Sequence, residues 1–420
     1  MKILYVIQQS ILNNDKKWLS ADSNINMAAG LMRAWIAKNN LEDTQVTIAI
    51  APLNTFADIE TYDDVFPSHP NIDYFELPMT RSSALNRIDF NTQAWHNYIE
   101  PKGDYDCIIC CVPEWILDIK TLYNVINKKM PTIIAQCFWM DTPMIGEPKF
   151  PENATMQYRQ FEGFALSDLV AFTCRSVMDA WEENARKFVA SSAVDDIMYK
   201  STVWDFGYSQ AEFDAFYGPL NTNTERVRIG FLNRITGDDY THFAEFVAAL
   251  NILKSDPKYA DSFDVVLTNP SKRVSEEHLQ SVVPNYVPAN NGEPMNREQY
   301  LSLLFHCDVT VHLFTKERYG GCALRESIAA KNIVIVADCF EQSELVWDID
   351  FRVPAYPVKP EDIAASMKTA IDTCLMRLLD ADLIRSYDMQ EWTQTTNRNK
   401  CSFESQIEIF LDDLVRIVVF

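Results

Sequence analysis

Glycine is scarce in this sequence: the 420 residues include only 11 glycines. Internal repeats and low-complexity tracts are missing as well. A solenoid would show self-similarity at a fixed period, and a disordered chain would be poor in apolar residues. Hydrophobic residues make up 47% of this chain, which argues for a globular protein. Its length exceeds what a single hydrophobic core normally serves, so we expect two domains.

Long apolar runs are also missing. The longest, residues 107–112 and 333–337, have the length of a strand. They fall far short of the roughly 20 residues that a membrane-spanning helix needs. Near the N-terminus, the apolar run 3–7 is followed at once by Gln8 and Gln9, which indicates a first buried strand rather than a signal peptide. We therefore expect a cytoplasmic protein without stable membrane insertion.

Positive charge is in short supply. The chain has 37 Lys and Arg against 59 Asp and Glu, and its formal net charge is −22. A protein this acidic repels phosphate backbones unless its basic residues gather on one face. This balance lowers the expectation of nucleic-acid binding without excluding it, because a local basic cleft can coexist with an acidic exterior.

Patterns typical of metal ligands are weak. The six histidines show no H-x3-H spacing, which argues against zinc. Most of the ten cysteines sit in apolar strand-like runs or in helices, and reduced thiols in the cytoplasm are the simpler interpretation. Two D-x-D triplets occur, at residues 104–106 and 348–350. The first flanks a buried strand and the second lies beyond the main motif, so no metal site is predicted.

Strand-length apolar runs alternate with helical patterns along most of the chain. Such alternation predicts parallel sheets covered by helices on both faces. The pattern breaks into polar residues around 221–224, and the alternation then resumes. We therefore predict an α/β protein of two Rossmann-like domains, residues 1–218 and 219–400, whose sheets face each other across a cleft. The predicted strands are residues 2–7, 45–50, 72–77, 105–112, 131–138, 169–174 and 201–206 in the first domain, and 227–232, 263–267, 308–314 and 333–337 in the second.

The cleft and the C-terminal segment complete this outline. Ligands of open α/β sheets bind beyond the carboxyl ends of the strands, so the cleft is the expected site. Residues 401–420 have a helical period that places Ile407, Phe410 and Leu414 on one face. The hypothesis, from length and position, is that this helix crosses back to the first domain.

One segment carries most of the chemistry. Residues 316–330 read KERYGGCALRESIAA; they follow an apolar strand and lead into a helix. A glycine turn that opens a helix at a strand's carboxyl end presents free N–H groups and the positive end of the helix dipole, which suit a pyrophosphate. The carboxylates of Glu317 and Glu326 could accept hydrogen bonds from sugar and ribose hydroxyls. The alternative is that both are ordinary solvated glutamates of a helix start.

This segment resembles the E-x7-E region of family-4-type retaining glycosyltransferases of the GT-B fold, in which E-x-F-G, a spacer and L-E-A-x-A precede a strand. Glu326 and the strand from residue 333 match the second half of that motif. The resemblance implies that Glu326 holds the ribose of a nucleotide sugar. It implies that Glu317 acts beside the donor sugar, with the amides of Gly320 and Gly321 nearby. The departure is that eight residues, not seven, separate the two glutamates.

Two further segments carry the resemblance. Residues 204–208, WDFGY, resemble the strand and glycine that close the N-terminal domain in that family. Residues 227–234, VRIGFLNR, resemble the first strand of the nucleotide domain, which ends in a basic residue. Arg234 is thereby implied to meet the diphosphate as a bidentate cation. The family's following lysine is absent, and Lys316 or Arg318 could replace it. An ordinary surface ion pair is the alternative for Arg234.

On the acceptor side, residues 136–141, QCFWMD, end an apolar strand where the family often places a histidine or aspartate beside the donor sugar. Asp141 is therefore the candidate to stabilise positive charge on the sugar or to take the acceptor's proton. A helix-capping aspartate before Thr142 is the alternative. The family's glycine-rich loop after the first strand is missing, since no glycine occurs before Gly30.

The resemblance implies a hexosyl- or pentosyltransferase of class EC 2.4. It would move a sugar from a UDP- or GDP-sugar to a glycan, small molecule or lipid head group, with retention of configuration. No cofactor is implied beyond the nucleotide sugar as co-substrate. Three alternatives stay open: the same chemistry on 5-hydroxymethylpyrimidine in DNA, as in phage DNA-modifying members, a sugar-nucleotide epimerase, and a non-catalytic nucleotide-binding protein.

Overall fold

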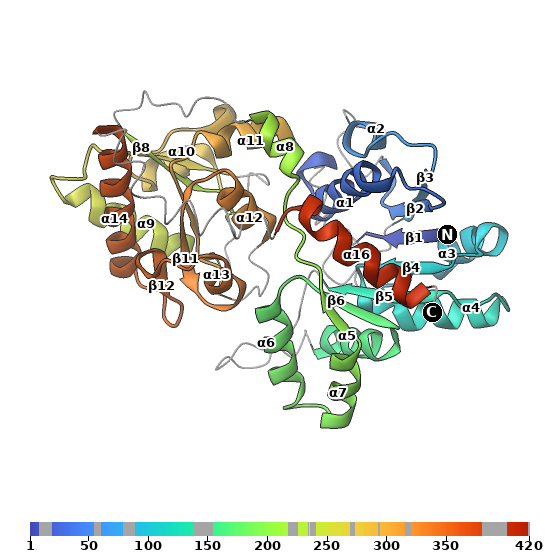
Figure 1. Ribbon diagram of the computed structural model, residues 1–420. Helices are drawn as coiled ribbons and strands as arrows, with labels where there is room; N and C mark the ends of the chain where they lie inside the picture. Colours follow the sequence, from blue (N-terminus) through green and yellow to red (C-terminus); the bar gives the residue numbers. More distant parts are fainter. Residues whose placement is uncertain are drawn as a thin grey trace. The chain divides into compact units, whose positions relative to one another are not determined.

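The protein consists of two compact units, each built on its own parallel sheet (Figure 1). Unit 1 comprises Met1–Phe206 and Phe403–Phe420, and unit 2 comprises Gly207–Ser402. The computed structural model describes residues 1–7, 19–53, 60–78, 89–137, 154–216, 226–233, 235, 241–268, 274–292, 295–315, 321–379 and 401–418.

Unit 1 holds a seven-stranded parallel sheet in the order β3-β2-β1-β4-β5-β6-β7. The inner strands are buried on both faces, which is why they appear in the sequence as continuous apolar runs rather than as alternating ones. All seven predicted strands are present. Their bounds are β1 Lys2–Val6, β2 Gln45–Ile50, β3 Ile72–Glu76, β4 Cys107–Cys110, β5 Thr132–Cys137, β6 Leu169–Phe172 and β7 Ser201–Val203.

Helices connect these strands, as parallel pairing requires. The first helix, α1, begins after Asp22, whose side chain accepts hydrogen bonds from the backbone N–H groups of Asn24 and Ile25. It ends at Asn40, which adopts the left-handed conformation of a helix C-cap. The helices of unit 1 are α1 Ser23–Asn39, α2 Tyr62–Val65, α3 Thr92–Lys102, α4 Ile116–Val125, α5 Ala154–Leu166, α6 Arg175–Ala185, α7 Ser191–Tyr199 and α16 Phe403–Val418.

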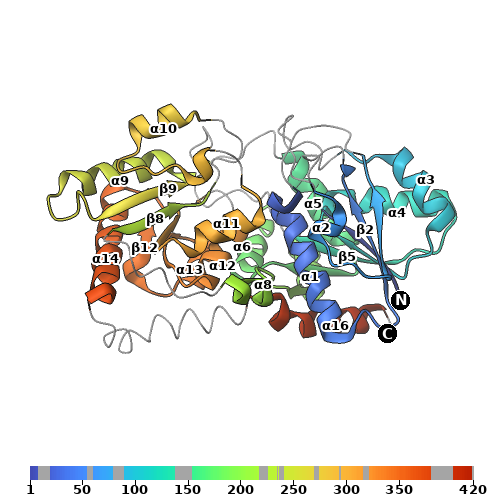
Figure 2. The ribbon, with the colours of Figure 1, turned by 90° about the horizontal axis from the view of Figure 1, so that it is seen from above.

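Helix α16, from the end of the chain, lies beside α1 in unit 1 (Figures 1 and 2). The ring of Phe410 lies edge-on to the rings of Trp35 and Trp204, with centroids 5.1 and 4.9 Å apart. The indole N–H of Trp204 donates to Asp413 at 3.0 Å. The ring of Phe403 packs so closely on Gly30 that a Cβ there would lie 2.2 Å from it. The last helix thus completes the core of the first unit.

The division between the units falls after Phe206, whereas the sequence analysis placed it after residue 218. The segment that follows Phe206 packs within unit 2: the rings of Phe213 and Phe216, on α8, lie 5.5 and 5.9 Å from the ring of Phe305. The predicted linker, residues 221–224, lies outside the described residues.

Unit 2 holds a five-stranded parallel sheet in the order β12-β11-β10-β8-β9. The four predicted strands are present, and β12 is an additional short strand at the edge. From β8 the chain first builds toward β9 and then, on the other side, toward β10, β11 and β12. The bounds are β8 Val227–Phe231, β9 Phe263–Leu267, β10 Val309–His312, β11 Ile333–Asp338, β12 Arg352–Pro354, α8 Gln210–Phe216, α9 Phe243–Ser255, α10 Glu276–Val282, α11 Arg297–Phe305, α12 Gly321–Ala329, α13 Phe340–Leu345 and α14 Pro360–Leu379.

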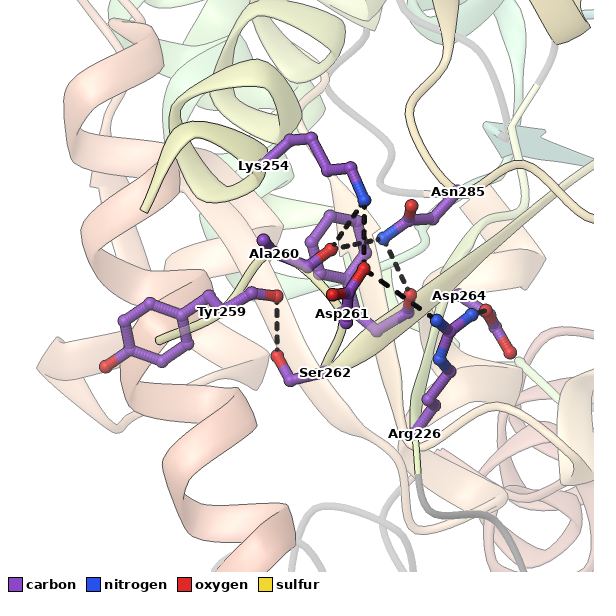
Figure 3. A network of polar contacts seen from close by, with 9 residues as sticks. Arg226, Lys254, Tyr259, Ala260, Asp261, Ser262, Asp264 and Asn285 are labelled. Atoms are coloured by element: carbon purple, nitrogen blue, oxygen red, sulfur yellow. Dashed lines mark hydrogen bonds and ion pairs between the residues drawn. The ribbon is translucent and has the colours of Figure 1, made fainter. Parts of the chain in front are cut away.

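A network of polar contacts lies at the edge of this sheet where β8 and β9 begin (Figure 3). Arg226, just before β8, donates to Asp264 of β9 at 3.0 Å. Lys254, near the end of α9, and Asn285 both donate to the backbone carbonyl of Ala260, at 2.9 and 3.0 Å. These groups form hydrogen bonds with one another. They lie at the edge of the sheet opposite to the one where ligands of such sheets bind. Their role is to hold the connection between α9 and β9.

Candidate functional site

The carboxyl ends of β8 and β10 are neighbours in unit 2, at the point where the strand order reverses. Ligands of open α/β sheets bind at such a point, because the loops that leave the two strands diverge there. The chain leaves β10 through Leu313, Phe314 and Thr315, and α12 begins at Gly321. The predicted glycine motif therefore starts from this edge of the sheet.

Two of the predicted site residues, Gly321 and Glu326, belong to the described part of the chain. The roles of all the predicted site residues, these two included, stay predictions. Those that lie outside the described residues are Asp141, Arg234, Lys316, Glu317, Arg318 and Gly320.

Gly321 opens α12 with a positive φ of 75°. Among the described residues, nothing lies within 4 Å of a side chain built there, so packing against them is not what requires glycine at this position. The backbone conformation is the reason, since residues with a Cβ rarely adopt it. The first amides of a helix have no partner within the helix, and the helix dipole is positive at that end. The turn at Gly321 therefore opens a helix start whose chemistry suits a phosphate.

Glu326 lies on the same helix and is only 4% exposed. One of its oxygens, Oε1, accepts from Nη1 of Arg297 at 2.5 Å. Arg297 in turn donates through Nε and Nη2 to the two carboxylate oxygens of Glu212, at 3.0 and 2.8 Å. Three helices, α8, α11 and α12, thus contribute one member each to a chain of charged groups in unit 2.

The start of α11 is built to hold Arg297. Asn296 caps this helix: its side chain accepts from the N–H of Gln299 at 2.9 Å, and the side chain of Gln299 accepts from the N–H of Asn296 at 3.0 Å. Such a reciprocal capping box satisfies two donors that the helix itself leaves unpaired. Arg297, as the first residue of the helix, is therefore carried by a fixed backbone.

Glu212, Arg297 and Glu326 form a charged cluster, in which the two carboxylates act on the pKa of the arginine. Burial lowers the pKa of Arg297, but Glu326 and Glu212 outweigh burial and raise that pKa, so the guanidinium stays charged. Burial also raises the pKa of the Tyr300 hydroxyl, and the charge of Glu326 adds to this rise. One cation between two carboxylates leaves a formal charge of −1. A carboxylate can accept about four hydrogen bonds, so Glu326 retains capacity for the hydroxyl groups of a ligand.

A buried histidine joins the two strand ends to α12. The Nδ1 of His312, on β10, lies 3.2 Å from Oδ1 of Asn233, and its Nε2 lies 3.0 Å from Oγ of Ser327 on α12. Asn233 also donates to the carbonyl of Val311 at 2.9 Å. Burial lowers the pKa of His312 to about 3, so its ring is neutral at physiological pH. Asn233, the residue before Arg234, is therefore fixed to β10, and His312 connects it to α12.

The segment between β10 and the glycine motif is held by separate elements. The carbonyl of Phe314 accepts from Gln342 at 2.6 Å, and the carbonyl of Thr315 accepts from the Tyr356 hydroxyl at 3.1 Å. The hydroxyl of Thr315 lies 2.7 Å from Nε2 of His242, which precedes α9 with a left-handed φ of 52°. Phe314 and Thr315, which lead from β10 toward the glycine motif, are thus held in place by hydrogen bonds.

Sequence reasoning missed four residues of this site: Glu212, His242, Arg297 and His312. They belong to four different segments, and no spacing in the sequence connects them. One local signal was present for Arg297: Asn296 and Gln299 have the spacing of a helix capping box, which places Arg297 at a helix start.

The two D-x-D triplets serve local structure. Asp106 accepts from the N–H of Lys2 at 2.7 Å, which ties the start of β4 to β1. Asp348 accepts from the N–H of Asp350 at 3.0 Å and begins a short 3-10 helix. Within the described residues, no three His, Cys, Asp or Glu side chains gather as metal ligands. No helix in that same part of the chain has the length and hydropathy to cross a membrane.

Comparisons with known proteins place the fold. No protein-family model matches the sequence, and no curated protein matches it. Solved structures match over nearly the whole chain. A glycosyltransferase from Rickettsia africae is 15% identical with a TM-score of 0.62, covering 99% of this chain and 98% of that one. The trehalose-6-phosphate synthase OtsA is 13% identical with a TM-score of 0.63, covering 99% of each chain.

A third similar structure is that of HepE from Anabaena in complex with UDP-glucose. It is 13% identical with a TM-score of 0.59, and the match covers 99% of this chain and 100% of that one. At such identities the likeness shows the fold: two Rossmann-like domains with parallel sheets, in the GT-B arrangement of chain and strands. The fold expected from the sequence resemblance is confirmed.

Proposed function

We propose that this protein is a glycosyltransferase that moves a sugar from a nucleoside-diphosphate sugar to an acceptor hydroxyl. The observation that carries the proposal is the geometry of α12 in unit 2. The helix opens at Gly321 with a positive φ beside the strand-order reversal, and the same helix carries the buried carboxylate of Glu326. A diphosphate and a ribose are ligands that match these two features.

The nucleotide is bound in one orientation under this proposal. The diphosphate meets the first amides of α12 together with Arg234, and Lys316 supplies a second cation. Glu326 accepts hydrogen bonds from the ribose hydroxyls. Charge develops on the leaving diphosphate during transfer, and preorganised amides and a guanidinium stabilise such charge without a metal ion or other cofactor. Glu317 and Asp141 act at the sugar and the acceptor, and configuration is retained.

We favour a UDP-hexose as the donor. Among the similar structures, HepE is a complex with UDP-glucose, and another, from E. coli, is bound with UDP-2-fluoro glucose. The acceptor is a glycan, a small molecule or a lipid head group. All ten cysteines are buried thiols, which is typical of a reducing compartment and supports a cytoplasmic location.

The test is nucleotide-dependent stabilisation of the full chain. UDP, GDP and their glucose derivatives are added to the wild type, to Arg234→Ala and to Glu326→Ala, and thermal unfolding is followed. A ligand at about 100 times its dissociation constant adds roughly 2.7 kcal/mol of stability. We expect UDP and UDP-glucose to stabilise the wild type and both variants to lose most of the effect. Glu277→Ala, at an exposed position of α10, is the matched control, and we expect UDP and UDP-glucose to stabilise it as they stabilise the wild type.

A second measurement follows the chemistry. UDP release from UDP-glucose is assayed with panels of sugars, glycans, lipid head groups and hydroxymethylated DNA, and the anomeric configuration of the product is read by NMR. Sugar transfer with the donor's configuration supports the full proposal. A well-folded wild type that no nucleoside diphosphate stabilises would show that the proposed donor site is wrong.

A further inference from the structure

Arg297 bridges two carboxylates that come from separate helices of unit 2. Its Nε and Nη2 bind both oxygens of Glu212, and its Nη1 binds Oε1 of Glu326. The side chains of Arg297, Glu212 and Glu326 are 17%, 25% and 5% exposed. The arrangement is therefore largely removed from water, where charge-assisted hydrogen bonds are stronger than at a surface.

We propose that Arg297 is a positioning residue for the nucleotide: anchored by Glu212, it fixes the carboxylate of Glu326 in the orientation that selects a ribose with both hydroxyls. This inference rests on the proposed function, because it concerns the same donor site. It adds two residues, Arg297 and Glu212, that the motif resemblance does not include.

The geometry assigns different tasks to the two carboxylates. The guanidinium is planar, and a bidentate contact through Nε and Nη2 fixes its plane. Glu212 uses both oxygens for this contact and so sets the orientation of Arg297. The remaining Nη1 then points at Glu326 and engages a single oxygen. A Glu side chain loses rotamer freedom when a ligand binds, and fixing it beforehand removes that cost from binding.

The charge of the cluster favours hydroxyl groups over phosphate. Two carboxylates and one guanidinium carry a net charge of −1, which repels a phosphate and attracts hydroxyl donors. Gly321 lies at the start of α12, whose dipole is positive there, and Glu326 lies further along the same helix. A nucleoside diphosphate would thus place its phosphates at the start of α12 and its ribose beside Glu326, further along the same helix.

The experiment compares UDP with 2′,3′-dideoxy-UDP, which lacks the two hydroxyls. Isothermal titration calorimetry gives both affinities for the wild type, Glu326→Gln, Arg297→Met, Arg297→Lys and Glu212→Gln. Hydrogen bonds between hydroxyls and a charged group correspond to a ratio of about 10- to 100-fold, which we expect for the wild type. In Arg297→Met we expect the ratio to fall to about threefold or less, with the affinity for dideoxy-UDP changed by less than about threefold.

The other variants separate positioning from folding. Arg297→Lys keeps the charge but not the planar fork, so its ratio is expected to lie between those of the wild type and Arg297→Met. Glu212→Gln leaves Glu326 intact and is expected to reduce the ratio as well. Arg226→Met removes an arginine ion pair at the opposite edge of the same sheet and keeps the wild-type ratio. Circular dichroism checks that each variant is folded.

The outcomes distinguish this inference from the proposed function. If Arg297 were only structural, its variants would lose affinity for both nucleotides equally and keep the ratio, which would overturn the inference. A wild type that binds UDP with a high ratio, alongside an unchanged ratio in all Arg297 and Glu212 variants, would overturn it while leaving the donor site in place. A wild type that binds neither nucleotide would instead contradict the proposed function.

Discussion

Arg325 and Glu341 form an ion pair in which neither side chain is exposed to solvent. Arg325 lies on α12 and Glu341 on α13, so the pair joins the helices that precede and follow β11. The stem of Arg325 covers Gly207, where a Cβ would lie 2.1 Å from Cδ of the arginine. The pair therefore fixes, from inside unit 2, the helix that carries Gly321 and Glu326.

Breaking this pair from one side is expected to destabilise the protein strongly. Arg325→Met removes this cation from beside the buried carboxylate of Glu341, and breaking a buried pair from one side costs about 3–5 kcal/mol. The free energy of unfolding is measured by urea denaturation of the full chain. The double variant Arg325→Met/Glu341→Leu removes both charges and is expected to lose less than the single variant. A double variant as unstable as the single one would contradict this account.

Gly321 allows a test of backbone conformation without a steric contribution. Because a Cβ at this position would touch none of the residues that the structure describes, we expect the loss in Gly321→Ala to come from the positive φ of 75°. The left-handed conformation costs a residue with a Cβ about 1–2 kcal/mol. Asparagine tolerates it better, so Gly321→Asn is expected to lose less stability than Gly321→Ala in urea denaturation. Equal losses in the two variants would mean that the conformation is not the cause.

Much of the fold could be predicted from the sequence, because parallel strands buried on both faces leave long apolar runs. Residues 107–112 are such a run, and β4 lies within them. By contrast, β12, Arg352–Pro354, has three residues and leaves no periodic signal. The unit boundary was placed too late by composition, because α8, Gln210–Phe216, belongs to unit 2 through packing against Phe305 rather than through any local pattern.

The candidate site was predictable only where it is contiguous in sequence. Gly321 and Glu326 stand five positions apart in one motif and were found together. Arg297 is 29 positions from Glu326 and 85 from Glu212, and it meets them through the packing of three helices. In the sequence, His312 is a polar residue inside the predicted strand 308–314, and nothing local marks it as part of a site. Its partners, Asn233 and Ser327, are defined only once β8, β10 and α12 are assembled.

His312 predicts a specific dependence of stability on pH. Its pKa is lowered by burial to about 3 in the folded protein, while an unfolded histidine has a pKa of about 6.5. Between these values the unfolded chain binds a proton that the folded one does not, so stability falls as the pH drops below about 6.5. From about pH 7 to about pH 5 this single group removes about 2 kcal/mol.

The measurement compares the wild type with His312→Gln, whose amide keeps hydrogen-bonding groups but does not titrate. Urea denaturation at the two pH values gives the change in unfolding free energy for each protein. We expect the variant to lose about 2 kcal/mol less than the wild type on acidification, whatever its stability at neutral pH. His306→Gln, at an exposed position, is the control for the effect of a His-to-Gln substitution as such. An identical pH dependence in wild type and His312→Gln would show that His312 titrates normally.

Phe410 tests whether α16 is part of the core of unit 1. Its side chain is fully buried among the rings of Trp35, Trp204 and Phe206, and Phe410→Ala is expected to cost about 3–5 kcal/mol. Its neighbour Ile409 is 45% exposed on the same helix, and Ile409→Ala is expected to change stability by no more than about 0.5 kcal/mol. Both variants have the same chain length and the same helix, so the difference in their unfolding free energies isolates the buried face. If the two variants were equally stable, the buried face of α16 at Phe410 would contribute nothing to the stability of unit 1.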